Sequence, residues 1–214
     1  MYHGSLGNAD RVKAELPWKP GAFCNTDAFS CSNWYRQAPE MLLNRRHGFT
    51  TVRSFTEDAE RYFAELGSAD RLFVRPDSAL KPFSGRLVER GEVSPAKLDH
   101  GFYYDDLDLP IVLAPTRNVR REWRLVVANG QPIAGSTYAA EGRQGQQDEV
   151  PAEVQHYARD AAENIDVGDP VYILDICETD EGLRLLELNP FSGADLYFCD
   201  RDRIVEAVTE VLDG

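Results

Sequence analysis

Residues 171–197, VYILDICETDEGLRLLELNPFSGADLY, decide how this chain folds. Two apolar runs of strand length, Val171–Cys177 and Leu183–Asn189, flank a short polar segment. This pattern predicts a hairpin of two antiparallel strands. Each run also contains a carboxylate, Asp175 in the first and Glu187 in the second. A carboxylate is costly to bury alone, so we expect each one to contact a cationic partner or a metal ion.

A five-residue loop, Glu178–Gly182, sets the expected register of this hairpin. Because side chains alternate between the two faces of a strand, this loop puts Asp175, Glu187 and Asn189 on one face. The two carboxylates are then diagonal neighbours, and a loop of even length would move Asp175 to the opposite face. Three oxygen donors on one face suit Mg²⁺ or Mn²⁺. The alternative is that the carboxylates pair with arginines and that the Asn-Pro dipeptide only ends the strand.

The segment before this hairpin predicts a second one. Glu122–Ala128 is a strand, Asn129-Gly130 is the typical signal for a type I′ turn, and Ile133–Tyr138 is the returning strand. The glycine-bearing stretch Gly142–Gln147 predicts a loop. Apolar residues at helical spacing predict two helices, at Pro151–Ile165 and Asp202–Leu212. The second half therefore predicts an α+β fold with antiparallel strands.

The first half of the chain carries shorter patterns. They predict two helices and two strands, at Asn33–Arg46, Ser54–Leu66, Arg71–Arg75 and Leu109–Ala114. In the second helix, Ser54 and Glu57 have the spacing of a capping box, and Gly67 is a typical C-terminal stop.

Basic residues gather in two places. One group follows the strand RLFVR and the other precedes the strand EWRLVVA: Arg75, Lys81, Arg86 and Arg90, and Arg117, Arg120, Arg121 and Arg124. Arginine and lysine are common ligands of phosphate and carboxylate groups. A solvated charged loop is the alternative for any single residue. Arg75 and Arg124 lie in apolar strand contexts, so these two are the ones that we expect to bind a ligand.

The composition excludes several classes of protein. The chain has 214 residues and a net charge of −13, and a field of this sign disfavours nucleic acid and anionic membranes as partners. No apolar run reaches the roughly 18 residues that span a bilayer, so we expect a cytoplasmic protein. The four cysteines form no CxxC pair and the four histidines no HExxH, which disfavours zinc. The sequence contains neither a GxxxxGKS/T phosphate loop nor a GxGxxG fingerprint.

The motifs resemble those of the ATP-grasp superfamily, in particular its compact bacterial and phage proteins. LDICETDEGLRLLELNPFSGADLY resembles the closing motif, in which an acidic residue and an E-x-N hold Mg²⁺. EWRLVVANGQPIAGSTY is similar to the strand pair that carries an acidic–x–Arg pattern. FVRPDSALKPFSG and IVLAPTRNV are similar to the segments that contact the phosphates and adenine. The resemblance covers about Leu72 to Tyr197, more than half of the chain.

The resemblance implies a fold and a set of site residues. The fold would have two α+β lobes with antiparallel sheets that hold a nucleotide between them, at 71–116 and 117–214, after a short N-terminal region at 1–70. Asp175, Glu187 and Asn189 match the metal ligands, Arg124 the catalytic arginine, Arg75 and Lys81 the phosphate contacts, and Val112, Leu113 and Ala114 the adenine pocket. Arg75 departs from the family pattern, which usually has lysine at this position.

The resemblance also implies an activity. It is an ATP-dependent ligase that joins a carboxylate to an amine through an acyl-phosphate, with ATP and Mg²⁺ or Mn²⁺ as cofactors. The partners would be small-molecule or peptide carboxylates and amines, and a homodimer is the commonest assembly for such a protein. We expect the Gly142–Gln147 loop to close over the site.

Two other classes of function share these residues. Asp175 and Glu187 superficially match the acidic pair of a metal-dependent nuclease, although that core normally has lysine where Asn189 stands. The third class is an inert module that binds a nucleotide or a protein, in which the two carboxylates form structural ion pairs.

Overall fold

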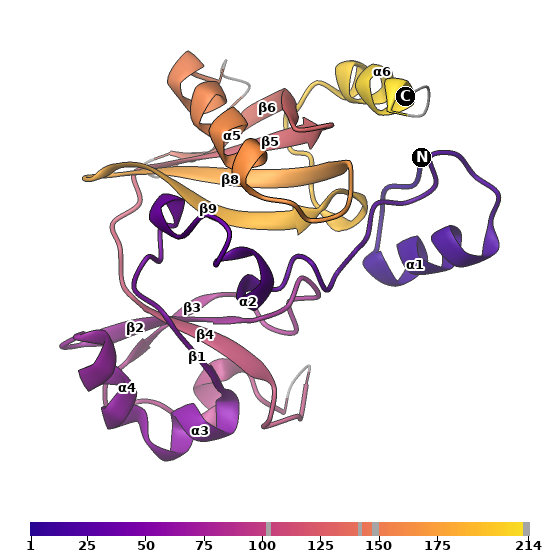
Figure 1. The fold of residues 1–214 in the computed structure, drawn as a ribbon. Helices are drawn as coiled ribbons and strands as arrows, with labels where there is room; N and C mark the ends of the chain where they lie inside the picture. Colours follow the sequence, from indigo (N-terminus) through magenta and orange to yellow (C-terminus); the bar gives the residue numbers. More distant parts are fainter. Residues whose placement is uncertain (102–103, 141–142, 147–149, 212–214) are drawn as a thin grey trace. The chain divides into compact units, whose positions relative to one another are not determined.

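The computed structural model describes residues 1–101, 104–140, 143–146 and 150–211. The chain forms two compact units, and each contains one antiparallel sheet (Figure 1). The first unit comprises Met1–Phe29, Trp34–Leu43 and Asn118–Gly214, and the second comprises Ser30–Asn33 and Asn44–Arg117. The expected α+β class with two antiparallel sheets is confirmed. Residues 1–70 contribute to both units.

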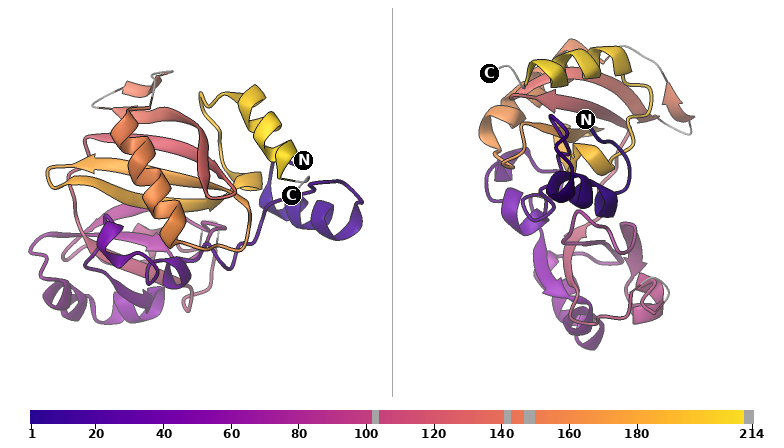
Figure 2. Two further views of the ribbon diagram at one scale, coloured as in Figure 1. Left: turned by 45° about the horizontal axis from the view of Figure 1, so that its top comes forward. Right: turned by 90° about the vertical axis from the view of Figure 1, so that its right-hand side faces the viewer.

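The first unit contains a five-stranded sheet with strand order β7-β6-β5-β8-β9. Its strands are β5 (Arg121–Ala128), β6 (Gln131–Ala140), β7 (Arg143–Gln146), β8 (Val171–Thr179) and β9 (Gly182–Pro190). Its helices are α1 (Leu6–Glu15), α5 (Ala152–Asn164) and α6 (Arg201–Glu210), with the 3₁₀ turns η1 (Pro39–Met41) and η3 (Phe191–Gly193). Figure 2 shows α5 lying across the strands of this sheet. Both predicted hairpins and both helices of the second half are confirmed.

The β5–β6 hairpin forms where the Asn-Gly signal predicted it. Asn129 and Gly130 both have positive φ, 47° and 73°, as a type I′ turn requires. The loop predicted at Gly142–Gln147 is partly wrong, because β7 pairs with the end of β6. Residues 142 and 147 lie outside the described residues.

The second unit contains a four-stranded sheet with strand order β1-β4-β2-β3. Its strands are β1 (Gly48–Thr51), β2 (Arg71–Pro76), β3 (Arg86–Glu89) and β4 (Pro110–Pro115). Its helices are α3 (Val52–Glu57) and α4 (Ala59–Leu66), with the 3₁₀ turn η2 (Pro95–Leu98). Apolar side chains of both helices pack on the sheet, including Phe55, Phe63, Leu72, Leu113 and Val74.

The helix predicted at Asn33–Arg46 is wrong. Only the short helix α2 (Cys31–Trp34) and the turn η1 form there. Pro39 lacks a main-chain N–H and disfavours helical backbone in the residue before it. Ala38 accordingly has φ −137° and ψ 58°, outside the helical region.

The capping box predicted at Ser54 is also wrong. The helix begins earlier, and the Thr51 hydroxyl caps it by accepting from the Ser54 N–H at 3.2 Å. Asp58 then breaks the predicted helix into α3 and α4. The predicted stop at Gly67 is confirmed, because this residue takes the left-handed conformation, φ 62°, that glycine adopts most easily.

The turn of the β8–β9 hairpin differs from the prediction. Thr179 pairs with Gly182, so the turn contains two residues rather than five. With a turn of this length, regular alternation alone would put Asp175 and Glu187 on opposite faces of the sheet.

A β-bulge corrects this mismatch. Ile176 pairs with Leu185, but the next residue of β8, Asp175, pairs with Glu187, so Leu186 is an extra residue on β9. A bulge of this kind shifts the alternation of one strand by one residue. Asp175 and Glu187 therefore lie directly opposite each other on one face, and the predicted diagonal arrangement is wrong.

Two expectations from composition can be compared with the structure. All four cysteines are free thiols in buried positions, as expected. Among the described residues, no helix has the length and apolar character needed to cross a membrane.

The core of the second unit predicts a local stability effect. Phe63 on α4 is fully buried, whereas Leu87 on β3 is 53% exposed. Phe63→Ala should lower the free energy of unfolding by about 3–5 kcal/mol, because it removes buried apolar area and leaves a cavity. Leu87→Ala is the control and should change it by less than about 0.5 kcal/mol. Urea denaturation measures both, and equal effects of the two substitutions would contradict this account of the core.

Candidate functional site

Three charged side chains lie in a row across the centre of the five-stranded sheet. Arg124 on β5 pairs with Asp175 on β8, and Asp175 pairs with Glu187 on β9. Directly paired residues of neighbouring antiparallel strands project to the same face. The sheet thus aligns these side chains through its main-chain ladder alone. Asn189 lies two residues beyond Glu187 on the same face.

Arg124 and Asp175 form a buried bidentate ion pair. Arg124 Nε donates to Asp175 Oδ1 at 2.8 Å and Nη2 donates to Oδ2 at 2.6 Å. The exposed fractions of these residues are only 6% and 2%. Burial disfavours the charged guanidinium, but the hydrogen bonds and charge of Asp175 outweigh burial and raise the pKa of Arg124. The pair is therefore ionised at any physiological pH, and each partner fixes the orientation of the other.

Two further contacts hold the guanidinium of Arg124. Its Nη1 donates to the main-chain oxygen of Asp195 at 2.8 Å. Its Cζ lies 4.8 Å from the centre of the Tyr197 ring, a cation–π contact. Tyr197 has φ 45°, an uncommon backbone conformation for a tyrosine. Neither contact was predicted, because both depend on how the chain turns after η3.

Asn189 joins the two carboxylates. Its Nδ2 donates to Asp175 Oδ2 and to Glu187 Oε2, both at 3.3 Å. The donor set therefore consists of two carboxylates and one amide within hydrogen-bond reach of that amide. Hard oxygen donors of this kind fit Mg²⁺ or Mn²⁺, with Asn189 turned to present its Oδ1. No group of three or more His, Cys, Asp or Glu side chains in the described ranges is arranged to hold a metal, so the amide is a necessary member of the set.

Glu122 adds a third carboxylate to this part of the sheet. It lies two residues before Arg124 on β5 and is half-buried. Burial raises its pKa, and the charges of Asp175 and Glu187 raise it further, while Arg124 acts in the opposite direction. Three carboxylates thus surround one guanidinium, and this excess of negative charge favours a bound cation. Strand alternation predicted that Glu122 shares a face with Arg124 but contained no sign of this effect.

The predicted phosphate contacts lie in the second unit. Arg75 is buried on β2, where it pairs with Val112 of β4. Lys81 is exposed in the segment after β2 and has φ 46°. Gly85 approaches this segment closely, since a Cβ there would lie 2.7 Å from the Phe73 ring and 3.7 Å from Arg75 Cβ. A buried arginine beside a tight segment agrees with a binding role, and that role stays a prediction.

The predicted adenine-contacting residues, Val112, Leu113 and Ala114, are all buried on β4. This strand lies between β1 and β2, so neighbouring strands use its main-chain groups. The pairing with β1 ends at Leu113, whereas Ala114 still pairs with β2. Ala114 is therefore the residue of the three whose main chain has a neighbour on only one side. The role of these residues at adenine stays a prediction.

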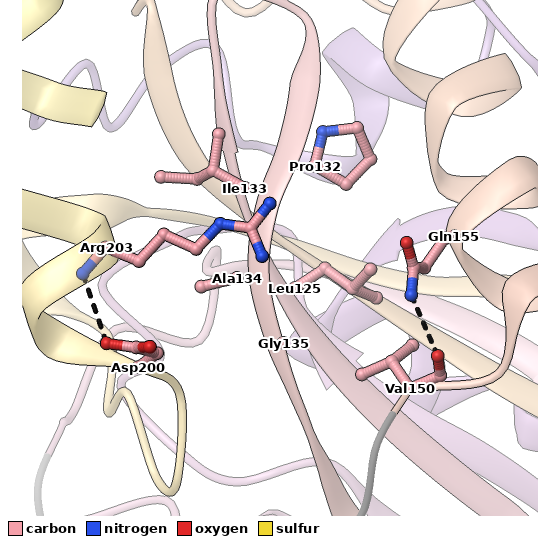
Figure 3. Close-up of a pocket in the computed structure, with 9 residues that line it drawn as sticks. All are labelled: Leu125, Pro132, Ile133, Ala134, Gly135, Val150, Gln155, Asp200 and Arg203. Carbon is pink, nitrogen blue, oxygen red and sulfur yellow. Dashed lines mark hydrogen bonds between the residues drawn. The ribbon is translucent and has the colours of Figure 1, made fainter. Parts of the chain in front are cut away.

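A separate hollow of about 200 Å³ lies between β6, α5 and α6 in the first unit (Figure 3). Its polar groups bond to one another. The Arg203 main-chain N–H donates to Asp200 Oδ1 at 3.1 Å, and Gln155 Nε2 donates to the Val150 oxygen at 2.9 Å. These local bonds cap α6 and α5, so this hollow is less suited to catalysis than the charged row.

Comparison with known proteins identifies the fold first. The solved structures that resemble this chain are ATP-grasp proteins, and the fold is an ATP-grasp fold. The chain belongs to the ATP-grasp superfamily, because the model of one ATP-grasp domain family, family 3 of its clade, matches residues 16–208. The comparison with curated proteins gives no significant match.

Three solved structures illustrate the similarity. The ATP-grasp ligase PsnB, complexed with its minimal precursor, is 18% identical with a TM-score of 0.57, over 87% of this chain and 60% of PsnB. The D-cycloserine synthetase DcsG is 14% identical with a TM-score of 0.62, over 97% and 76% of the two chains. D-alanine–D-alanine ligase from Bacillus anthracis is 14% identical with a TM-score of 0.62, over 99% and 80%. At these identities the likeness shows the fold alone.

The buried ion pair predicts strong coupling between its two partners. Arg124→Met alone should lower the free energy of unfolding by about 3–5 kcal/mol, because it leaves the Asp175 charge buried without its partner. The double variant with Asp175→Leu should lose much less than the sum of the two single effects. Urea denaturation of the four proteins in this cycle measures the coupling, and additive losses would show that the pair does not act as a unit.

The raised pKa of Glu122 predicts a pH effect on stability. The folded state holds the Glu122 proton more tightly than the unfolded state, so wild-type stability gained from this proton is lost as the pH rises through the folded pKa. The stability of Glu122→Gln relative to wild type should therefore increase from pH 4 to pH 8. Glu206→Gln, on the exposed side of α6, is the matched control. Denaturation curves at both pH values measure the difference, and a pH-independent difference would disprove the assignment.

Proposed function

We propose that this protein is an ATP-dependent ligase that joins a carboxylate to an amine. The observation that carries the proposal is the set formed by Arg124, Asp175, Glu187 and Asn189 on one face of the five-stranded sheet. Membership of the ATP-grasp superfamily supports it. PsnB, which this chain resembles in fold, has been solved with a precursor, Mg and ADP.

The two carboxylates and the amide would hold a divalent cation. Bound Mg²⁺ would neutralise charge on the β- and γ-phosphates of ATP. Asp175 is kept ionised and correctly oriented by Arg124, and Glu187 is held near it by Asn189. We propose that Arg75 and Lys81 bind phosphate oxygens and that the backbone at Ala114 meets adenine.

The reaction would proceed in two steps. An oxygen of the substrate carboxylate attacks the γ-phosphorus, the bond to the bridging oxygen breaks, and ADP leaves. The nitrogen of the amine then attacks the acyl carbon of this acyl-phosphate, phosphate leaves, and the amine loses a proton. Arg124 would donate to the oxyanion that develops at the acyl carbon, where a fixed donor stabilises the transition state. The expected substrates are peptides or small molecules that carry these two groups.

The proposal predicts loss of turnover when the acidic row is changed. With a carboxylate and amine pair found by screening for ADP release, Asp175→Asn and Glu187→Gln should each lower kcat on the order of 100-fold. Glu181→Gln, in the exposed hairpin turn, is the matched control and should retain activity. Circular dichroism verifies that the variants are folded. Full turnover in both acidic-row variants would refute the assignment of the metal ligands.

A second pair of variants tests the phosphate contacts. Arg75→Ala should raise the KM for ATP by about tenfold, since a charge-assisted hydrogen bond contributes about 1.5–3 kcal/mol. Arg71→Ala, at the exposed start of the same strand, should leave the KM unchanged. Mg-ATP calorimetry separates binding from turnover, because binding without ADP release in the presence of every substrate pair would favour the inert module. Nicking of plasmid DNA with Mg²⁺ would favour the nuclease.

A further inference from the structure

A hollow of about 320 Å³ lies at the C-terminal end of α5, in the first unit and away from the charged row. It is formed by the last residues of the helix, by the loop 165–170 that leads into β8, and by Tyr172 on β8. Tyr172 precedes Ile173 on β8, and Ile173 shares the face of Asp175. Because side chains alternate, Tyr172 projects to the opposite face. This hollow is therefore separate from the proposed ligase site.

Tyr172 places an unsatisfied hydroxyl in this hollow. Its side chain is buried, since only 4% of the residue is exposed, and the ring packs near Phe29 at a centroid distance of 6.4 Å. Its Oη has no hydrogen-bond partner in the part of the chain that the structure describes. Burial raises the pKa of Tyr172 to about 12, with a further contribution from Asp166, so the hydroxyl is neutral at physiological pH. A buried hydroxyl without a partner is costly, and a ligand that donates to it would remove this cost.

The walls of the hollow are negatively charged. Glu163, Asp166 and Asp169 line it, and no lysine, arginine or histidine is among the residues that the structure places around it. Helix α5 ends here with no basic residue in its last turn, although the negative end of a helix dipole favours one. Arg159, one turn earlier, donates instead to Gln131 Oε1. The charge of the site therefore favours a cation.

The loop that forms the hollow is held rigidly by two side chains. Gln37 donates to the main-chain oxygen of Asp166 at 3.0 Å and accepts from its N–H at 2.8 Å. Asn25 donates through Nδ2 to the Val167 oxygen at 3.1 Å, and its N–H donates to Asp169 Oδ2 at 2.8 Å. These four bonds fix the shape of the loop before any ligand binds, which lowers the entropic cost of binding.

The arrangement selects the kind of cation. The three carboxylates are not clustered as metal ligands, since no group of three such side chains within the described ranges could hold a metal. A protonated amine needs no such cluster, because one N–H can donate to the Tyr172 hydroxyl while its charge interacts with carboxylates at the rim. We propose that this hollow binds an alkylammonium group, from either a free amine or a lysine side chain.

Titration calorimetry with the full chain tests the proposal. The probe is 1,5-diaminopentane at constant ionic strength, and the expected result is saturable binding to the wild type. Tyr172→Phe should weaken this binding at least about fivefold, because one hydrogen bond is lost. Asp166→Asn should weaken it as well, while Glu206→Gln on α6 removes the same charge elsewhere and should have no effect. Because Tyr172→Phe removes an unsatisfied hydroxyl, the Tm of the free protein should not fall.

Three further probes separate the alternatives. Nα-acetyl-lysine amide that binds more tightly than the diamine would identify a peptide lysine, and the reverse order would identify a free amine. The neutral 1,5-pentanediol should not bind, and KCl should not replace the diamine. Absence of diamine binding to the folded wild type, equal binding by Tyr172→Phe, or equal binding of pentanediol would each overturn the proposal. ATP turnover is not needed for any of these measurements, so their failure is distinct from failure of the proposed ligase activity.

Discussion

The buried ion pair between Arg124 and Asp175 is the constraint on which the charged row depends. A guanidinium and a carboxylate at this depth are tolerated only when they meet with good geometry. Two parallel hydrogen bonds across adjacent central strands meet this requirement, and they tie the register of β5 to that of β8. Glu187 and Asn189 are positioned relative to Asp175, and Tyr197 is positioned relative to Arg124. A shift of one residue in either strand would separate the pair and leave two charges buried alone.

Much of the fold could be predicted because local signals agreed with the tertiary structure. The Asn129-Gly130 turn and the helical spacing on α5 are of this kind, since each is decided by a few neighbouring residues. The predicted helix at Asn33–Arg46 was wrong because Pro39 prevails over the apolar spacing around it. The register of the β8–β9 hairpin was wrong for another reason. No local signal in the sequence marks Leu186 as an extra residue, because a bulge is set by cross-strand pairing.

The candidate site was predictable to the extent that it lies on strands. Alternation brought Asp175, Glu187 and Asn189 to one face, although two errors, in loop length and in regular pairing, cancelled. Contacts from irregular segments could not be predicted in this way. The Asp195 oxygen and the Tyr197 ring reach Arg124 only through the course of the chain after η3, and the effect on Glu122 depends on how deeply β5 is buried.

The extra residue at Leu186 also separates the length of the hairpin from the chemistry on it. On the turn side of the bulge, pairs run from Ile176–Leu185 to Thr179–Gly182, and on the other side they resume at Asp175–Glu187. Omitting Leu186 would make these two sets of pairs continuous without changing a single partner. The turn and the acidic row can therefore accumulate insertions and deletions independently during evolution. An alignment of relatives that permits no gap within this strand would misplace either the turn or the E-x-N.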